Sequence, residues 1–344
     1  MKKIILLLTV LMTFSCGDKE IEVKRIQFTS SSEDAKALMD KVLYNQEARR
    51  GWFNSVNEDL IDSILTLDPN FAAGIVEMMV QLGVQRKDTV ALLMTGSMPG
   101  ANIAVLAACK AMGVFPISIT SVGASQWGAN QIDFTWLDME SILFENNFIP
   151  SKSVAASIGG RNDMGRLLSP AGRKIIADNI YNHRIPIIRE GRLVDNIKNR
   201  MDLFDDFLRI DKYSAIINVG GGVASLGTSF NLRLLPPGKV FRADLLDIGR
   251  PGGVEGVVSK FVNLNVPGLH ILNIRSLTEQ LKMPYAPIPI PDIGFGSLYA
   301  DERYNLKVAF ICLTIVAGSV FYVGSQSRKK IKEYLIDHEP DSLL

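Results

Sequence analysis

Residues 90–102, VALLMTGSMPGAN, decide the fold class of this chain. The uninterrupted apolar run over residues 90–94 predicts a strand buried on both faces, since a half-exposed strand would alternate apolar and polar residues. A polar turn containing glycine follows, and residues 101–112 then show the apolar spacing of a helix. The stretch therefore predicts a strand, a loop and a helix in direct succession.

The same succession recurs along the chain. Further buried strands are expected at residues 114–120, 153–158, 185–189, 215–219 and 269–274. Helices are expected between them at residues 136–146, 171–183, 195–209 and 253–262. Because apolar strands that alternate with helices form parallel sheets covered on both faces, the sequence predicts an α/β fold with a mostly parallel, doubly wound, Rossmann-like sheet.

This α/β domain is expected at residues 86–283. A helical N-terminal segment at residues 30–85 precedes it. A Pro-rich linker at residues 284–306 follows it, where repeated prolines remove backbone donors and favour an extended path.

Residues 1–16 have the proportions of a signal peptide or N-terminal anchor. Lys2 and Lys3 precede an apolar run at residues 4–12 that is too short to span a bilayer. Cys16 follows a small residue, as in a lipoprotein cleavage box, and is a candidate for lipidation. Lipidation, plain cleavage and an uncleaved anchor are the three alternatives.

The second membrane signal lies near the C-terminus. Residues 308–324 are uncharged, and they predict a transmembrane helix at residues 307–324. Arg328, Lys329 and Lys330 follow, as cytoplasmic flanks do, whereas a buried core helix has no need of such a flank. The sequence thus predicts a protein of the bacterial cell membrane, with an extracytoplasmic main domain and a cytoplasmic tail at residues 325–344.

Composition excludes several classes of function. The 37 Lys and Arg residues balance 36 Asp and Glu residues, so no overall basic field attracts nucleic acid. The three cysteines are widely separated, and the chain has no CxxC or Cys/His cluster. We therefore expect no metal, no cofactor and no nucleic-acid partner.

Candidate binding residues follow the predicted strands, because ligands of open α/β sheets bind beyond the carboxyl ends of the strands. In the first loop, Thr95, Gly96 and Ser97 offer hydroxyl groups and a close backbone approach before a helix start that favours an anion. The alternative is a tight connection without a ligand. The second loop contains Ser125, Gln126 and Trp127, which could stack against a ligand and donate hydrogen bonds to it. The alternative is a loop that packs on the edge of the sheet.

Two later loops carry charge or consecutive glycines. Arg161 and Arg166 could hold a carboxylate or phosphate, with Asp163 orienting one of them; surface ion pairing is the alternative. In the fourth loop, an oxyanion could be held by the backbone N–H groups of Gly220, Gly221 and Gly222. The side-chain amide of Asn218 could add a further donor. A simple turn is the alternative there, and the dinucleotide spacing of glycines is absent.

The histidines limit any hydrolytic mechanism. A Ser-His-Asp triad would have to use His183 or His270, and neither is expected in a strand-end loop. Ser97 is the candidate nucleophile, although the G-x-S-x-G spacing of a nucleophile elbow is absent.

Residues 95–102, 121–130 and 217–225, together with the C-terminal apolar span, resemble the poly-gamma-glutamate system protein family. The resemblance extends over most of residues 30–325. It implies an accessory role in making, exporting or anchoring a poly-γ-glutamate capsule or released polymer, beside other proteins of that system in the cell envelope. It assigns no active-site residues.

Three hypotheses follow. The first is a membrane-anchored component that binds poly-γ-glutamate or a partner protein. The second is a hydrolase or transferase acting on γ-glutamyl amide bonds, with Ser97 as nucleophile and the loop at residues 220–222 holding the oxyanion. The third is an envelope binding protein for a small anionic solute.

Overall fold

The structure is a computed structural model of the chain. It describes residues 21–23, 69–123, 130–131, 134–166, 168–228, 231–245, 254–284, 298, 300–302 and 306–337. The predicted signal peptide with Cys16, most of the segment at residues 30–85 and most of the Pro-rich linker lie outside these residues. The chain forms two units, one of Met1–Lys24 with Ala300–Leu344 and the other of Arg25–Tyr299, and each is described by itself.

The larger unit is built on a seven-stranded sheet with the order β7-β6-β3-β2-β8-β10-β9. All neighbours pair in parallel except β9, which is antiparallel to β10 at one edge. The strands are β2 (Thr89–Thr95), β3 (Phe115–Ser121), β6 (Ala155–Ser157), β7 (Ile187–Ile188), β8 (Ala215–Val219), β9 (Gly238–Val240) and β10 (Gly268–Ile271). The predicted α/β fold with a mostly parallel sheet is confirmed.

The strand order reverses next to the central strand β2. From β2 the chain passes outward through β3, β6 and β7, then returns to place β8 on the other side of β2 and β10 beyond it. Loops that follow β2 and β8 therefore leave neighbouring strands in opposite directions. This reversal is where an open α/β sheet leaves a crevice.

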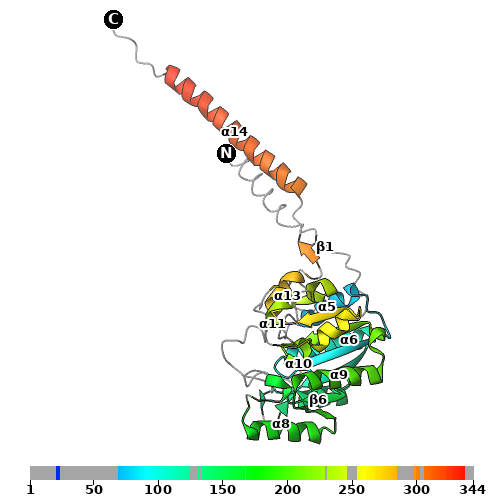
Figure 1. The fold of residues 1–344 in the computed structure, drawn as a ribbon. Coiled ribbons are helices and arrows are strands. Elements are labelled where there is room, and N and C mark those ends of the chain that lie inside the picture. Colours follow the sequence, from blue (N-terminus) through cyan, green and yellow to red (C-terminus); the bar gives the residue numbers. More distant parts are fainter. Residues whose placement is uncertain are drawn as a thin grey trace. The chain divides into compact units, whose positions relative to one another are not determined.

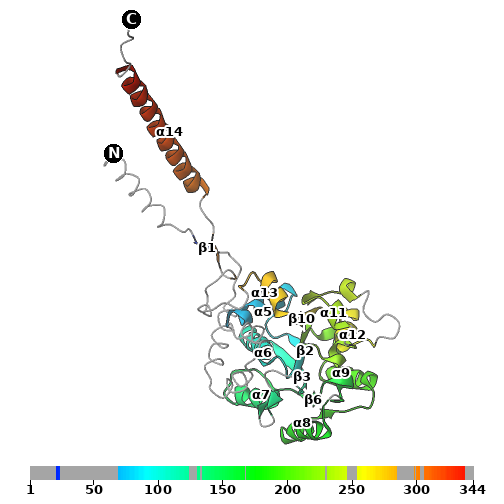
Figure 2. The ribbon, with the colours of Figure 1, turned by 90° about the vertical axis from the view of Figure 1, so that its left-hand side faces the viewer.

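Helices cover both faces of the sheet, as Figure 2 shows with the sheet seen between two groups of helices. One face is covered by α5 (Pro69–Gln81), α6 (Pro99–Met112), α7 (Trp136–Glu145) and α13 (Ile274–Gln280). The other is covered by α9 (Leu193–Phe207), α10 (Val223–Leu226), α11 (Asn231–Leu234) and α12 (Val257–Asn263). The remaining long helix, α8 (Pro170–Asn182), contacts β6 and β7.

Alternation along β2 explains the two hydrophobic clusters. Val90, Leu92 and Met94 belong to the cluster with α5, α6 and α7, whereas Ala91 and Leu93 belong to the cluster with α9 and α12. Successive strand side chains point to opposite faces, so an uninterrupted apolar run fills both layers.

Some predicted boundaries differ from the structure. The expected strand at residues 269–274 ends at Ile271, because Asn273 caps α13 by accepting a hydrogen bond from the Ser276 N–H. The strand at residues 185–189 shortens to Ile187–Ile188. The antiparallel strand β9 was not predicted. The described part of this unit also contains three short helices, η1 (Arg161–Asp163), η2 (Ile210–Lys212) and η3 (Arg242–Leu245), and the strand pair β4 (Asn130–Gln131) with β5 (Phe134–Thr135).

The smaller unit contains β1 (Ile21–Val23), β11 (Ala300–Glu302) and α14 (Leu306–Asp337), the last drawn in orange to red in Figure 1. By length and composition, residues Ala309–Tyr334 of α14 are apolar enough to cross a membrane, and none of their most apolar stretch is buried in the protein. The helix extends beyond the predicted span at residues 307–324 and continues through the basic residues to Asp337. The side of the membrane and the cytoplasmic tail at residues 325–344 stay predictions.

Candidate binding site at the carboxyl edge of the sheet

The loops after β2 and β8 meet at the reversal of strand order. Leu93 pairs with Asn218, so Thr95 lies level with Gly220 on the next strand. A Cβ atom on Gly220 would lie 2.2 Å from Thr95 Oγ1, and Gly220 has a φ of +90°. Glycine is therefore required there by both the close approach and the left-handed backbone.

Replacing Gly220 with alanine is expected to lower the free energy of unfolding by roughly 2–4 kcal/mol, from backbone strain and overpacking together. Thermal unfolding followed by circular dichroism measures the change. Gly191→Ala is the matched control, because its new Cβ would meet nothing within 4 Å. If Thr95→Ala in the Gly220→Ala background restores none of the loss, the contact between the two loops is not its cause.

Backbone contacts fix the loop after β2, and one of its hydroxyl groups, that of Ser97, is partly exposed. The Gly96 N–H donates to Ser121 O at 2.8 Å, and a Cβ on Gly96 would lie 2.2 Å from Val122 O. Ser97 Oγ is partly exposed and lies 3.3 Å from Thr95 Oγ1. Among its described contacts Ser97 has no histidine or carboxylate that could act as a base, so its role as nucleophile stays a prediction.

The start of α6 adds backbone donors. Met98 at the N-cap makes no side-chain capping hydrogen bond, and Pro99 has no N–H. The N–H groups of Gly100 and Ala101 thus have no intrahelical acceptor. Asn102 is buried and donates to Thr95 O at 2.9 Å, while its Oδ1 atom has no partner among the described residues. This helix start is suited to a negatively charged group.

Asn218 and His270 form a buried pair on β8 and β10. Asn218 Nδ2 donates to Gly220 O at 2.8 Å and lies 2.9 Å from His270 Nδ1. Because this geometry makes Nδ1 an acceptor, the His270 proton lies on Nε2. Burial lowers the pKa of His270 to about 4, so the ring is neutral. Asn218 Oδ1 and His270 Nε2 have no partner among the described residues. The amide of Asn218 thus holds the loop after β8 and not, as predicted, an oxyanion.

The glycines after β8 differ in what they can donate. The Gly220 N–H is used within the sheet, since it donates to Ile271 O at 2.9 Å. Gly221 is exposed and Gly222 is partly exposed, and their N–H groups make no hydrogen bond with the described backbone. Of the predicted oxyanion loop, these two residues remain available to a ligand.

The loop after β6 contains a buried ion pair. Arg200 Nη1 of α9 lies 2.7 Å from Asp163 Oδ2, and both side chains are only 1% exposed. Ser157 Oγ donates to Asp163 Oδ1 at 2.8 Å and accepts from Arg200 Nη2 at 2.8 Å. Ser121 Oγ lies 3.4 Å from the same Asp163 oxygen. Asp163 is therefore anchored inside the domain.

This pair corrects the predicted arginine clamp. Asp163 was expected to orient Arg161 or Arg166, but within the described part of the chain its ion pair is with Arg200. Both loop arginines are exposed, and Arg166 donates to Gly191 O at 3.3 Å. They remain available to an anion, but Asp163 does not hold them.

His183 lies at the end of α8, where it joins α7. Its Nε2 atom lies 2.8 Å from Asp138 Oδ1 and its Nδ1 atom 3.1 Å from Ser141 Oγ. Burial alone would raise the pKa of Asp138, but hydrogen bonds from His183 and Thr135 outweigh it and hold the pKa below its usual value. Because Asp138 also accepts from Thr135 and Asn179, this cluster fastens two helices rather than facing the strand-end loops.

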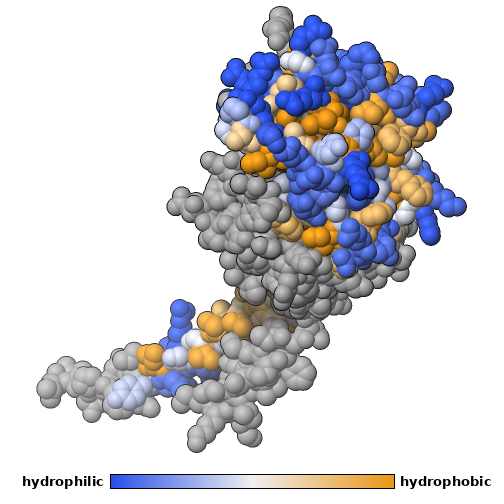
Figure 3. Space-filling view, turned by 90° about the horizontal axis from the view of Figure 1, so that it is seen from below, coloured by the Kyte–Doolittle hydropathy of each residue, from blue (hydrophilic) through white to orange (hydrophobic). Residues whose placement is uncertain are grey.

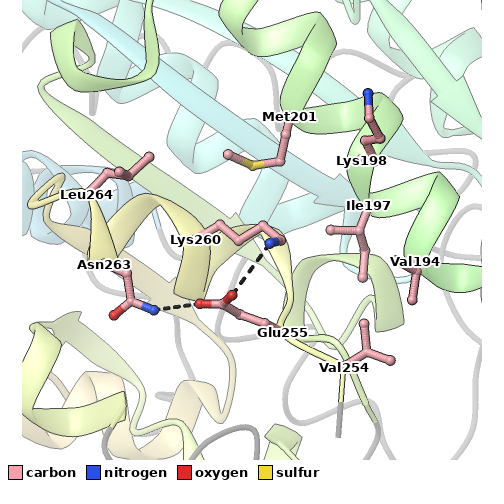
Figure 4. A pocket seen from close by; sticks show the side chains of 9 residues that line it. All are labelled: Val194, Ile197, Lys198, Met201, Val254, Glu255, Lys260, Asn263 and Leu264. Carbon is pink, nitrogen blue, oxygen red and sulfur yellow. Dashed lines mark hydrogen bonds and ion pairs between the residues drawn. The ribbon is translucent and has the colours of Figure 1, made fainter.

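A separate groove of about 700 Å³ lies between α9 and α12 (Figure 4). On the α12 wall of the groove, Lys260 pairs with Glu255 at 3.4 Å, and Asn263 donates to the same carboxylate. The groove is lined by Val194, Ile197, Lys198, Met201, Val254, Glu255, Lys260, Asn263 and Leu264. None of the predicted strand-end residues lines it.

The surface view in Figure 3 shows apolar patches on the larger unit interrupted by hydrophilic side chains.

Several predicted residues are not described by the structure. Ser125, Gln126 and Trp127 of the second loop lie outside the described residues, as does Cys16. Their roles stay predictions. Among the described residues, no group of three or more His, Cys, Asp or Glu side chains is placed to hold a metal ion.

Fold and site together define an α/β protein with a mostly parallel sheet, polar loops at its strand reversal, and a separate helix long enough to cross a membrane. No protein-family model, curated protein or solved structure matches the chain.

Proposed function

We propose that this protein is a membrane-anchored component of a bacterial poly-γ-glutamate system that binds the carboxylates of the polymer at the loops after β2 and β8. The observation that carries the proposal is the meeting of these two loops at the strand reversal, the usual ligand position of a doubly wound, Rossmann-like sheet. The resemblance to the poly-gamma-glutamate system protein family supplies the identity of the polymer.

The donors at this position suit a carboxylate. Ser97 Oγ and the N–H groups of Gly221 and Gly222 are at least partly exposed, and the uncapped first turn of α6 adds positive potential. The exposed side chains of Arg161 and Arg166 can pair with carboxylates of further units. A polymer with one carboxylate per unit would use both features.

The anchor in this proposal is α14. In the proposed orientation the larger unit lies outside the cell and the basic end of α14, with Arg328, Lys329 and Lys330, lies at the cytoplasmic face, as the positive-inside rule favours. A reporter fused after Leu344 should then be active only in the cytoplasm. Activity of that reporter only outside the cell would reverse the orientation.

A charge placed in the loop tests the binding site. Gly221→Asp in the full-length protein, purified in detergent, is expected to weaken binding of fluorescent poly-γ-glutamate about tenfold, because one like charge costs roughly 1.4 kcal/mol at short range. Fluorescence anisotropy at low salt measures the dissociation constant.

The matched control is Gln85→Glu. Gln85 is exposed in the turn before β2, at the opposite edge of the sheet, so this variant adds one negative charge away from the loops. If both variants bind the polymer equally weakly, the effect comes from the net charge of the protein and not from the loop. If Gly221→Asp binds as the parent does, the loop is not the binding site. Shortening of the polymer during the assay would favour a hydrolase or transferase instead.

A further inference from the structure

The pairing of β1 with β11 fixes the direction in which both chain ends leave the smaller unit. The two strands are antiparallel, with Ile21 opposite Glu302 and Val23 opposite Ala300. The chain that enters β1 and the chain that leaves β11 are therefore at the same end of this two-stranded ribbon. The segment before Ile21 and the segment after Glu302 therefore both begin at this end of the ribbon.

The distances along the chain are short on both sides. Leu306, the first residue of α14, is four residues after Glu302, which allows at most about 14 Å of extended chain. Cys16, at the end of the predicted signal segment, is five residues before Ile21, or at most about 17 Å. If α14 enters a membrane, the segment before β1 reaches the same membrane surface.

We propose that the segment before β1 and helix α14 are both attached to one face of the membrane, with the β1–β11 ribbon standing at that face. Arg25–Tyr299, the larger unit, is then joined to the membrane by both of its chain ends. The proposal rests on the membrane role of α14 but not on polymer binding.

Double attachment also explains how so short a ribbon persists. Three residue pairs in two strands are marginally stable alone. Two strands whose outer ends are held in one membrane have a high effective concentration for each other, which favours pairing. Release of the N-terminal segment would remove this advantage.

The sequence before β1 offers two candidates for this attachment, and both are apolar. The run at residues 4–12 is only about 14 Å long as a helix, too short to cross a core of about 30 Å, so it would lie at the interface. A lipid on Cys16 would anchor the same position. Both sources place an apolar anchor within reach of Ile21.

Selective cleavage in the full chain tests the attachment. A recognition sequence for a site-specific protease is inserted between Glu302 and Leu306, or between Lys24 and Arg25, or at both places. Isolated membranes are cleaved and washed with alkaline carbonate. Either single cut is expected to leave Arg25–Tyr299 in the membrane fraction, and the double cut should release it. Release after the single cut at Glu302 would overturn the proposal.

The source is distinguished by Cys16→Ala in the chain with the site after Glu302. Release on cleavage would assign the attachment to a lipid. Retention would show only that the uncleaved apolar run is sufficient, because the change also removes the cleavage box, and the mass of the N-terminal fragment of the parent chain then decides between the two sources. Both results are read against the parent chain cut in the same way.

The ribbon itself is tested by a cross-link. Glu22 lies opposite Asp301, and opposite positions in antiparallel strands have Cα separations that a disulfide accommodates. Glu22→Cys with Asp301→Cys is expected to form an intramolecular disulfide on mild oxidation in membranes. Glu22→Cys with Glu333→Cys, near the far end of α14, is the control. A cross-link no more frequent than the control would contradict the register.

Discussion

Replacing Arg200 with methionine is expected to lower the free energy of unfolding by about 3–5 kcal/mol, because the change leaves the Asp163 carboxylate buried without its charge partner. The variant also removes the donor that Arg200 supplies to Ser157. Thermal unfolding followed by circular dichroism should show a midpoint lower by roughly 10 °C.

The control is Arg209→Met. Arg209 pairs with Asp211 at 3.1 Å, but its side chain is 73% exposed, so its loss should cost no more than about 1 kcal/mol. Asp163→Asn in the Arg200→Met background removes both charges and should recover part of the loss. If Arg200→Met were as stable as Arg209→Met, the buried pair would not hold the domain together.

The same pair bears on the loop that carries the two exposed arginines. Asn162 and Asp163 have positive φ values of 56° and 62°, which cost about 1 kcal/mol or more each for residues other than glycine. The ion pair between Arg200 and Asp163 offsets this backbone strain. Loss of Arg200 is therefore expected to loosen the positions of Arg161 and Arg166 as well as to destabilise the core.

The fold could be predicted where apolar spacing is strong. The run at residues 90–94 became β2 (Thr89–Thr95), and the helix expected at residues 101–112 became α6 (Pro99–Met112). The antiparallel edge strand β9 has only three residues, two of them Gly238 and Lys239, and therefore no apolar run to reveal it. Its existence depends on pairing with β10, which is a tertiary contact.

The candidate site was predictable in position but not in its partners. Loops after strands meet at one edge of a parallel sheet, which places Thr95 beside Gly220. Arg200 was missed because an arginine within an amphipathic helix is usually solvated, and its partner Asp163 comes from a loop 37 residues earlier. Spacing along the chain suggested Arg161 and Arg166 instead.

The sequence contained one signal for the buried pair of Asn218 and His270. His270 is a polar residue inside an otherwise apolar strand, and its neighbour Asn218 interrupts β8 in the same way. Two such interruptions predict a cross-strand polar pair only when the strand order is known. β8 and β10 are neighbours although 48 residues lie between them, so the sequence alone could not join the two side chains.

Stability is expected to fall as pH rises from about 4.5 to about 7, because of Glu140 on α7. Burial raises the pKa of this carboxyl to about 7, although hydrogen bonds from the Ser153 N–H and Oγ lower it in part. The folded protein thus holds a proton that the unfolded chain releases near pH 4.5. Since the folded state binds more protons across this window, rising pH favours unfolding, and the effect levels off above pH 7.

Glu140→Gln isolates this effect from every other titrating group. A shift from 4.5 to about 7 corresponds to about 3 kcal/mol, so the variant should gain about that much relative to the parent between pH 4 and pH 8. Glutamine keeps the shape, and its Oε1 and Nε2 atoms can serve the N–H and hydroxyl of Ser153. Urea unfolding at a series of pH values measures the difference.

Glu145→Gln, on the exposed end of the same helix, should track the parent. A Glu140→Gln difference that is constant with pH would mean that Glu140 titrates normally, and that water reaches the cluster of Glu140, Ser153 and Thr120 inside the domain.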